Sequence, residues 1–423
     1  MVALALLAAN AASASEAACE RALLEELGWR FLAADAAQPR IDAGTPCERT
    51  SIADAQARGG LRVEVPADAS SATIDALHRE LLAHPATTCA YAFKLGDATR
   101  RAVDRLAANP GYRFSGLQAG WIGFGLFGGA ARDGWRPIAG FGRGYVPRDR
   151  NSGAINAFYS GNVRAECGVG RQVAQLAAQA ELYGPDGFDA AFAPEEIAIG
   201  TWHVLNRSGG ILQGAAAGEM TRDGLARKAS ALGRQAFMGV PGYIEHVFAR
   251  DTLDDINNQA ENFVVYDVDA QAASALRARG GFAEHNAMAE DLWRLSQSMP
   301  RQGSRYFERL LVEREPALRT QLDPTQAATL ARLDAIVADP FFSGFRIYVH
   351  RHGVTPIAYH FVRLLDRNPR TPFRAALALH NVHTTLMQRW FEHRLLGCGR
   401  RRGPGAIGES QAVAPTARAA RRD

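Results

Sequence analysis

Lysine is nearly absent from this chain of 423 residues, because Lys94 and Lys228 are the only lysines among its 48 basic residues. Arginine therefore supplies almost all of the positive charge. Two explanations are open: a coding bias in a genome that favours Ala, Arg and Gly, or a surface that offers few primary amines to chemical reaction. The bias carries little weight as evidence for function.

Cysteine is also scarce, and its spacing excludes the common cysteine-rich classes. The five cysteines are Cys19, Cys47, Cys89, Cys167 and Cys398. Their number is odd and their spacings match neither a zinc site nor a Cys-x-x-Cys redox motif, so neither is predicted. If the chain is exported, we expect a disulfide between Cys19 and Cys47, which leaves Cys167 as a thiol.

Long apolar runs are missing, and so is a strong charge spread over the whole chain. No stretch approaches the length of a membrane-spanning helix, and apolar residues make up an ordinary 47%. The net charge of +4 arises in residues 399–423, where six arginines oppose Glu409 and Asp423. This basic tail is expected to be disordered, and the near-neutral body gives no reason to expect a nucleic-acid partner.

Four segments are predicted along the chain. Residues 1–65 form an N-terminal leader and irregular segment, whose alanine-rich start fits either a signal peptide without a basic n-region or a plain leader. Residues 66–320 form the main domain, residues 321–398 a mainly helical extension, and residues 399–423 the disordered basic tail. Beyond residue 320 the patterns predict helices over 324–338 and 372–396 and a strand over 345–350.

The histidines of the extension invite a metal-site interpretation. His350 with His352, and His380 with His383, have spacings that metal ligands use. No carboxylate or cysteine completes either set nearby, so no metal is predicted.

Cys167 is the most informative residue of the chain, because it opens a segment that reads as a helix. Apolar residues recur after it at helical spacing, at Val169, Val173, Leu176 and Ala180, and Gly184 is a stop signal. The positive end of a helix dipole favours the thiolate form of a cysteine in the first turn, and the thiolate is the nucleophile. The alternative is a small buried residue at a helix start.

Blocks of residues around and after Cys167 occur in a distinctive order. They are Glu166-Cys167, Phe188-Asp189-Ala190-Ala191-Phe192, Trp202-His203, the loop Gly239-Val240-Pro241-Gly242-Tyr243, Glu261-Asn262 and Phe282-Ala283-Glu284-His285. In this order they resemble the small bacterial protein-glutamine gamma-glutamyltransferases, the spore-coat transglutaminase type. The resemblance covers roughly residues 145–315.

The resemblance implies an α+β fold with a papain/NlpC-P60-like core, in which a nucleophile helix packs on an antiparallel sheet, and a helical C-terminal extension follows. The main domain would then be the catalytic one. The family pattern implies that Cys167 pairs with Glu261. It also implies that Glu166 is an assisting glutamate and that His285 is a supporting histidine.

The resemblance also implies the substrates, which are the glutamine and lysine side chains of proteins, and no cofactor. Trp202 matches the aromatic wall of the substrate passage, with His203 beside it. Two departures from the family stand out. The gap between Glu261 and His285 is longer because residues 269–279 read as an inserted helix, and the chain continues well beyond the end of the family.

The implied reaction is acyl transfer from glutamine to a lysine amine through a Cys167 thioester, with release of ammonia and formation of gamma-glutamyl-lysine cross-links. The alternative is a cysteine-dependent hydrolase on the same core, such as a deamidase, a peptidase or a peptidoglycan amidase. Such hydrolases usually pair the cysteine with a histidine. A third hypothesis is a non-catalytic binding protein that retains a degenerate core.

Overall fold

The structure is a computed structural model that describes most of the chain between residues 85 and 397. The described ranges are 29–31, 61–63, 85–114, 134–138, 144–161, 163–165, 167–200, 211–212, 234–247, 260–350, 352–367, 374–379 and 383–397. The tail 399–423 lies outside them, as do Glu166, Trp202, His203 and all of the leader 1–65 except two short strands.

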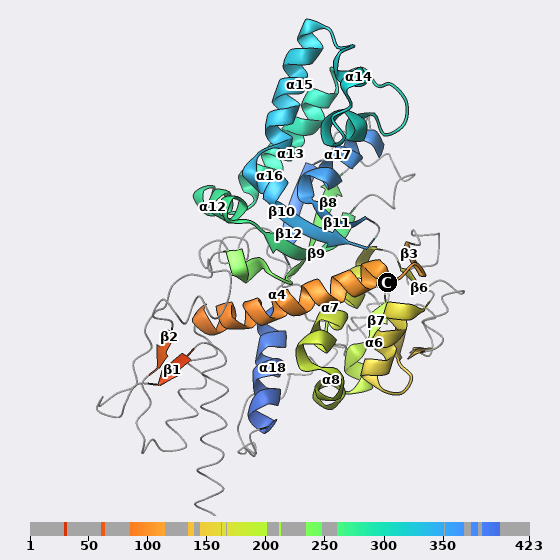
Figure 1. Cartoon of the computed structure of the whole chain (residues 1–423), viewed down its shortest axis with the longest axis vertical. Coiled ribbons are helices and arrows are strands. Elements are labelled where there is room, and N and C mark those ends of the chain that lie inside the picture. The colour runs from red at the N-terminus through yellow and green to blue at the C-terminus, as the bar shows by residue number, and fades with distance from the viewer. Residues whose placement is uncertain are drawn as a thin grey trace, which may run out of the picture.

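The centre of the fold is an antiparallel sheet of five strands in the order β11-β10-β9-β8-β12. The strands are β8 (Pro241–Val247), β9 (Ala260–Val268), β10 (Phe345–Val349), β11 (Gly353–Pro356) and β12 (Arg374–Leu379). Helices lie on both faces of this sheet (Figure 1), so the protein is α+β, as predicted. Because both faces are covered, the middle of β9 reads Phe-Val-Val without polar alternation.

One face of the sheet carries α7 (Cys167–Tyr183), which packs on β9, and α4 (Pro85–Ala108), which packs along α7. Every residue of α7 from Val169 to Gln179 is buried, so this helix is central. Val264 and Tyr348 join its apolar side chains in one core. The layer, which lies below the sheet in Figure 1, is completed by α6 (Asn151–Ser160), α8 (Pro185–Ala191) and α18 (His383–Gly397).

The opposite face of the sheet covers a second apolar core. Phe263 and Val265 of β9 belong to it, together with Ile244 of β8 and Ile347 of β10. Its helices, drawn above the sheet in Figure 1, include α12 (Ala270–Ala278), α13 (Ala283–Ser296), α14 (Pro316–Arg319), α15 (Pro324–Val337), α16 (Pro340–Gly344) and α17 (Ile357–Arg367).

The range 321–398 is mostly helical, but it also supplies β10, β11 and β12, three of the five central strands. The helix predicted over 324–338 is confirmed as α15 and the strand over 345–350 as β10. The helix predicted over 372–396 is wrong at its start, because residues 374–379 form the edge strand β12. Their Arg-Ala-Ala-Leu-Ala-Leu sequence favours a helix, yet pairing of all six residues with β8 overrides that propensity.

The helix predicted over 269–279 is confirmed as α12. Asp269 caps it, since its carboxylate accepts a hydrogen bond from the backbone N–H of Ala272 at 2.7 Å. This helix lies in the second core, against α16.

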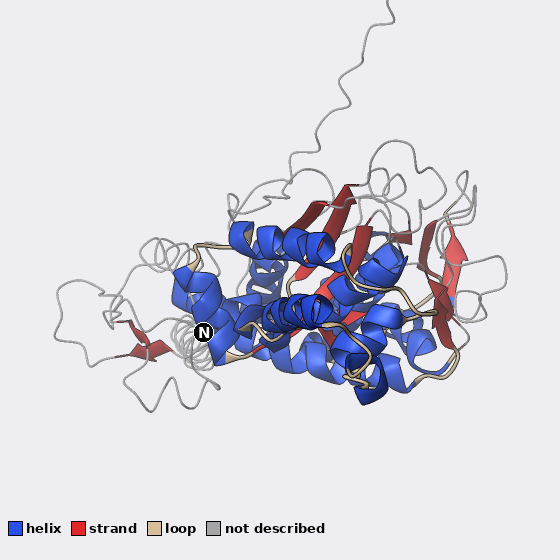
Figure 2. Ribbon diagram, turned by 90° about the horizontal axis from the view of Figure 1, so that it is seen from above, coloured by secondary structure: helices blue, strands red, loops and turns tan. Residues whose placement is uncertain are grey.

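Three smaller sheets flank the central one. β3 (Tyr112–Phe114) pairs with β6 (Val163–Ala165), and β5 (Gly144–Pro147) lies between β4 (Trp135–Pro137) and β7 (Ile199–Gly200). The parallel pair β1 (Trp29–Phe31) and β2 (Leu61–Val63) lies apart from the helical layers in both views (Figures 1 and 2).

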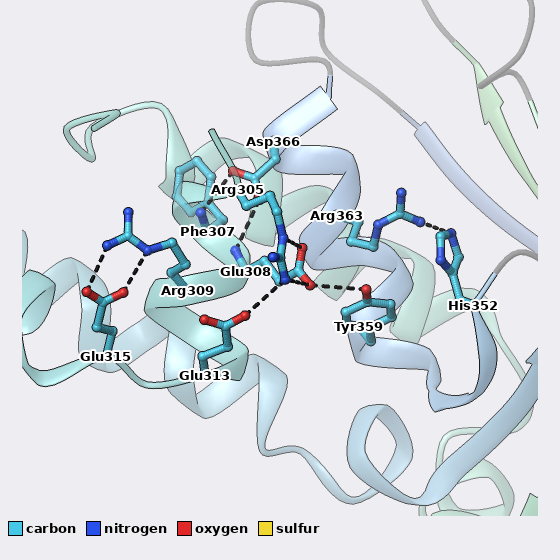
Figure 3. A network of polar contacts seen from close by, with 10 residues as sticks. All are labelled: Arg305, Phe307, Glu308, Arg309, Glu313, Glu315, His352, Tyr359, Arg363 and Asp366. Carbon is cyan, nitrogen blue, oxygen red and sulfur yellow. Dashed lines mark hydrogen bonds and ion pairs between the residues drawn. The ribbon is translucent and has the colours of Figure 1, made fainter. Parts of the chain in front are cut away.

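A polar network fastens the π turn η4 (Glu308–Val312) to α17 in the second layer (Figure 3). Asp366 accepts hydrogen bonds from the backbone N–H of Phe307 at 2.9 Å and of Glu308 at 3.1 Å, and so caps the turn from another helix. The Glu308 carboxylate binds the Arg305 guanidinium and accepts a hydrogen bond from the Tyr359 hydroxyl at 3.1 Å. These contacts are internal to the layer, so we assign them a structural role.

Candidate active site around Cys167

Cys167 is the first residue of α7, and its side chain is half-buried. The strand β6 ends two residues before it and pairs in parallel with β3, with Tyr112 opposite Val163. This pairing fixes the chain just ahead of the helix. It also brings Tyr112 to the same region of the molecule as Cys167.

Asn262 of β9 contacts the thiol directly. Its side-chain amide nitrogen Nδ2 lies 3.5 Å from Sγ of Cys167, within hydrogen-bonding range for sulfur. The residue directly across from Asn262 on β8 is Tyr243. Directly opposed residues share one face of a sheet, so Tyr243 lies on the same face as Asn262 and α7.

His350 also lies beside the first turn of α7. It follows β10 directly, two residues after Tyr348, which is paired with Val264 on the α7 side of the sheet. If this register is continued by two residues, His350 lies opposite Asn262 of β9, and its side chain is on the same face of the sheet. A Cβ added to Gly170 would lie 2.6 Å from Cβ of His350, so the absence of a side chain at Gly170 makes this close approach possible.

The imidazole of His350 is held in a buried setting. The ring of Tyr112 stacks on it, with centroids 3.8 Å apart and planes inclined by 29°. Burial lowers the pKa of His350 to about 4, and the nearby backbone of Arg113 opposes this only in part. Neither ring nitrogen is exposed to solvent.

Glu261, the predicted partner of Cys167, is buried on the other face of β9. Successive side chains of a strand point to opposite faces, so Glu261 points away from the face that carries Asn262. The residue directly across from it is Ile244, a member of the second core, and its i+2 neighbour Phe263 belongs to the same core. The structure therefore does not bring Glu261 to the thiol.

His285, the predicted supporting histidine, is fully buried in α13 in the second layer. Its Nδ1 lies 3.0 Å from the carbonyl oxygen of Gly281 and its Nε2 lies 2.9 Å from Nη1 of Arg279. The same Arg279 is paired with Asp339 through both terminal nitrogens. Burial, and then the charge of Arg279, lower the pKa of His285 to about 4. Its contacts are those of a packing histidine, on the side of the sheet away from Cys167.

The remaining predicted site residues, Glu166, Trp202 and His203, lie outside the described residues. The chain immediately before Trp202 is described, however. Gln172 of α7 donates to the carbonyl oxygen of Gly200 at 2.8 Å and accepts from its N–H at 2.9 Å. This double hydrogen bond ties the end of β7 to the helix that begins with Cys167.

A cavity of about 300 Å³ lies near the other end of α7, lined in part by Leu182, Tyr183 and Trp390. A helix of 17 residues spans about 25 Å, so this cavity is not part of the Cys167 site. Within the described part of the chain no group of three His, Cys, Asp or Glu residues is arranged to hold a metal ion.

Sequence reasoning missed His350 as a neighbour of Cys167 and considered it only as a metal ligand. The two residues are far apart in the sequence, and only the register of β10 against β9 brings them together. A weak signal was available in the sequence. Gly168 and Gly170 leave two positions in the first turn without side chains, in a helix that is otherwise rich in Ala and Gln. Glycine within a helix often marks a close approach by another element.

No family model, curated protein or solved structure matches this chain. Among the described helices none has the length and apolar character needed to cross a membrane.

Proposed function

We propose that this protein is a thiol-dependent acyltransferase in which Cys167 is the nucleophile. The observation that carries the proposal is the position of Sγ at the start of a buried helix of 17 residues, 3.5 Å from the side-chain amide of Asn262. A helix N-terminus and an N–H donor both favour a thiolate over a thiol. The first residue of the helix also has a backbone N–H that can bind a developing oxyanion.

The proposed chemistry is attack on a carboxamide. The Cys167 thiolate forms a C–S bond to the carbonyl carbon, the carbonyl π electrons move to oxygen, and an oxyanion results. When the oxyanion collapses, the C–N bond breaks and the nitrogen takes up a proton to leave as ammonia. An amine then forms a new C–N bond to the thioester, the C–S bond breaks, and the sulfur recovers its proton.

We assign the core, within the same proposal, to the papain/NlpC-P60-like type. The supporting features are a central helix that opens with the cysteine and an antiparallel sheet on which that helix packs. Such a core holds the nucleophile on a rigid element, where positioning contributes most to the rate.

The substrates that we propose are protein glutamine as the acyl donor and a lysine amine as the acceptor. The order of motifs from Glu166-Cys167 to Glu261-Asn262 supports this choice. Tyr112 stacks on His350 and Tyr243 lies opposite Asn262, and aromatic rings suit the apolar stem of a lysine.

The second candidate is a cysteine hydrolase on the same core, with water as the acyl acceptor. One observation favours it: a histidine, His350, lies at the first turn of α7, whereas Glu261 faces the second core. Cysteine hydrolases commonly use an imidazole in that position.

The test is mass spectrometry of a glutamine-containing peptide incubated with the protein and a primary amine. Acyl transfer joins the amine to the peptide with loss of ammonia, and hydrolysis converts the amide to an acid. Cys167→Ala is expected to abolish both products, and Cys398→Ala, the same change at another cysteine, is expected to leave the rate unchanged. Full activity in the Cys167→Ala protein would refute the proposal.

A further inference from the structure

We propose that His350 is the base that removes the proton from the Cys167 thiol and later protonates the leaving nitrogen. The inference rests on the proposed function, because it assigns a second catalytic residue to the same site. It differs from what the motifs imply, which is a Cys167–Glu261 pairing. The argument is geometric and starts from the first turn of α7.

Gly170 lies three residues after Cys167, on the same side of α7. Side chains at i and i+3 of a helix have Cβ atoms about 5–6 Å apart. The bond from Cα to Cβ leans toward the helix N-terminus, so the Cβ position of Gly170 lies on the side of Cys167. His350 occupies that position, with its Cβ, Cγ and Cδ2 atoms 2.6, 3.0 and 3.3 Å from it. The imidazole therefore lies beside the first turn of α7, on the side of Cys167.

The sheet supports the same placement from the other side. Asn262 contacts Sγ at 3.5 Å, and His350 reaches the level of Asn262 when the ladder of Tyr348 with Val264 is followed two residues further. Residues from α7, β9 and the end of β10 therefore lie at the same level of the sheet and on the same face. Nucleophilic cysteine chemistry commonly uses an adjacent base to activate the thiol.

The state of the ring suits a base. Tyr112 stacks on the imidazole and fixes its plane, and both ring nitrogens are shielded from solvent. Burial lowers the pKa of His350 to about 4, so the ring is neutral at pH 7 and has a lone pair. A thiolate that forms beside the ring favours the imidazolium, because an opposite charge raises the pKa of an imidazole.

The residues that the motifs suggest in this role are placed elsewhere or undescribed. Glu261 and His285 lie in the second core, across the sheet from α7. Glu166 lies outside the described residues.

The proton transfers balance over the cycle. The thiol proton passes to His350 as the C–S bond forms, and the imidazolium passes it to nitrogen as the C–N bond breaks and ammonia leaves. The neutral ring next accepts a proton from the attacking amine or water. It returns that proton to sulfur when the C–S bond breaks, which restores the thiol and the neutral imidazole.

The test compares His350→Gln with His393→Gln, the same substitution at a histidine of α18 near the other end of α7. Two rates are measured on the full chain: turnover in the glutamine-peptide assay, and alkylation of Cys167 by iodoacetamide, followed by peptide mass spectrometry. His350→Gln is expected to lower turnover by roughly two to four orders of magnitude, the usual loss for a general acid or base. It should also slow alkylation, whereas His393→Gln should change neither rate.

The outcomes separate this inference from the proposed function. If Cys167→Ala abolishes turnover but folded His350→Gln retains it, the inference fails and the function stands. If the wild-type protein has no turnover, the function fails, and the alkylation rate alone decides whether His350 acts on the thiol.

His350 packs closely on Gly170, so a substitution of His350 could lower turnover by disturbing the fold. A second variant separates this effect from loss of the base. His350→Ala leaves space for free imidazole, and its turnover is expected to rise with added imidazole. No rise in a folded His350→Ala protein would overturn the assignment.

Discussion

At the residue scale, the candidate site combines Cys167, whose place at a helix start can be read from the sequence, with neighbours that the sequence does not reveal. Cys167 was predictable because helix periodicity, a stop glycine and helix-dipole chemistry are all local signals. His350 and Asn262 were not predictable as its neighbours, because their approach depends on strand register and on the face that each side chain takes. One residue of shift along β9 separates Glu261, which faces the second core, from Asn262, which touches the thiol.

Asn262 offers a charge-sensitive test of the thiolate. Asn262→Asp places a carboxylate where an amide now donates toward Sγ, and a like charge disfavours the thiolate. We expect the pH profile of Cys167 alkylation by iodoacetamide to move to higher pH, with a smaller move in Asn262→Ala. An unchanged profile in both variants would mean that the amide does not act on the sulfur.

His285 makes a prediction for stability. Its pKa is about 4 in the folded protein and about 6.5 when unfolded. The unfolded state therefore binds more protons between these values, so the stabilisation is complete above pH 6.5 and is lost as the pH falls toward 4. We expect the unfolding midpoint to decline over that interval, and less steeply in His285→Gln. An equally steep decline in His285→Gln would show that protonation of His285 does not cause the loss of stability.

At the element scale, the contact between α7 and the end of β10 depends on Gly170. An alanine there would bring Cβ to 2.6 Å from Cβ of His350, closer than two such atoms approach. We expect Gly170→Ala to destabilise the protein by about 1–3 kcal/mol, the usual effect of overpacking, and to lower turnover because His350 is displaced.

Gly153→Ala is the matched control for this substitution. Gly153 is exposed in α6, and a Cβ there would meet only Cβ of Arg150 at 4.0 Å. Alanine is the better helix former, so this variant should be neutral or more stable in urea unfolding. Equal stability of Gly170→Ala and wild type would show that the helix and strand tolerate a wider separation.

The elements themselves were partly predictable. Helices α12 and α15 were predictable from their periodic patterns, and the structure shows that Asp269 and Asp323 cap them. The strand β12 was not predictable, because its alanines and leucines favour a helix and only pairing with β8 makes it extended. Long-range pairing decides such segments, and no local window contains it.

At the scale of the whole molecule, the central sheet draws on distant parts of the chain. β8 and β9 lie within the predicted domain 66–320, whereas β10, β11 and β12 come from the predicted extension 321–398. The strand that ends beside the thiol is therefore among those furthest from Cys167 in sequence. The motifs that the sequence offers stop before residue 320 and so contain only part of the site.

Truncation tests this organisation. A chain that ends at residue 320 lacks three of the five strands and exposes Phe263 and Val265, so we expect it to aggregate. A chain that ends at residue 398 loses only the tail 399–423, which has few large apolar residues, and should keep its stability and activity. A soluble, fully active protein of 320 residues would show that the extension is a separate domain.

The most direct test of the central claim, that Cys167 carries the acyl group, is the mass of the protein itself during turnover. The full chain is mixed with a glutamine-containing peptide without amine, quenched in acid and examined intact and after digestion. The account predicts an adduct equal to the peptide minus ammonia, located on Cys167 and absent from Cys167→Ala. Product formation with no adduct on Cys167, or an adduct that persists in Cys167→Ala, would contradict it.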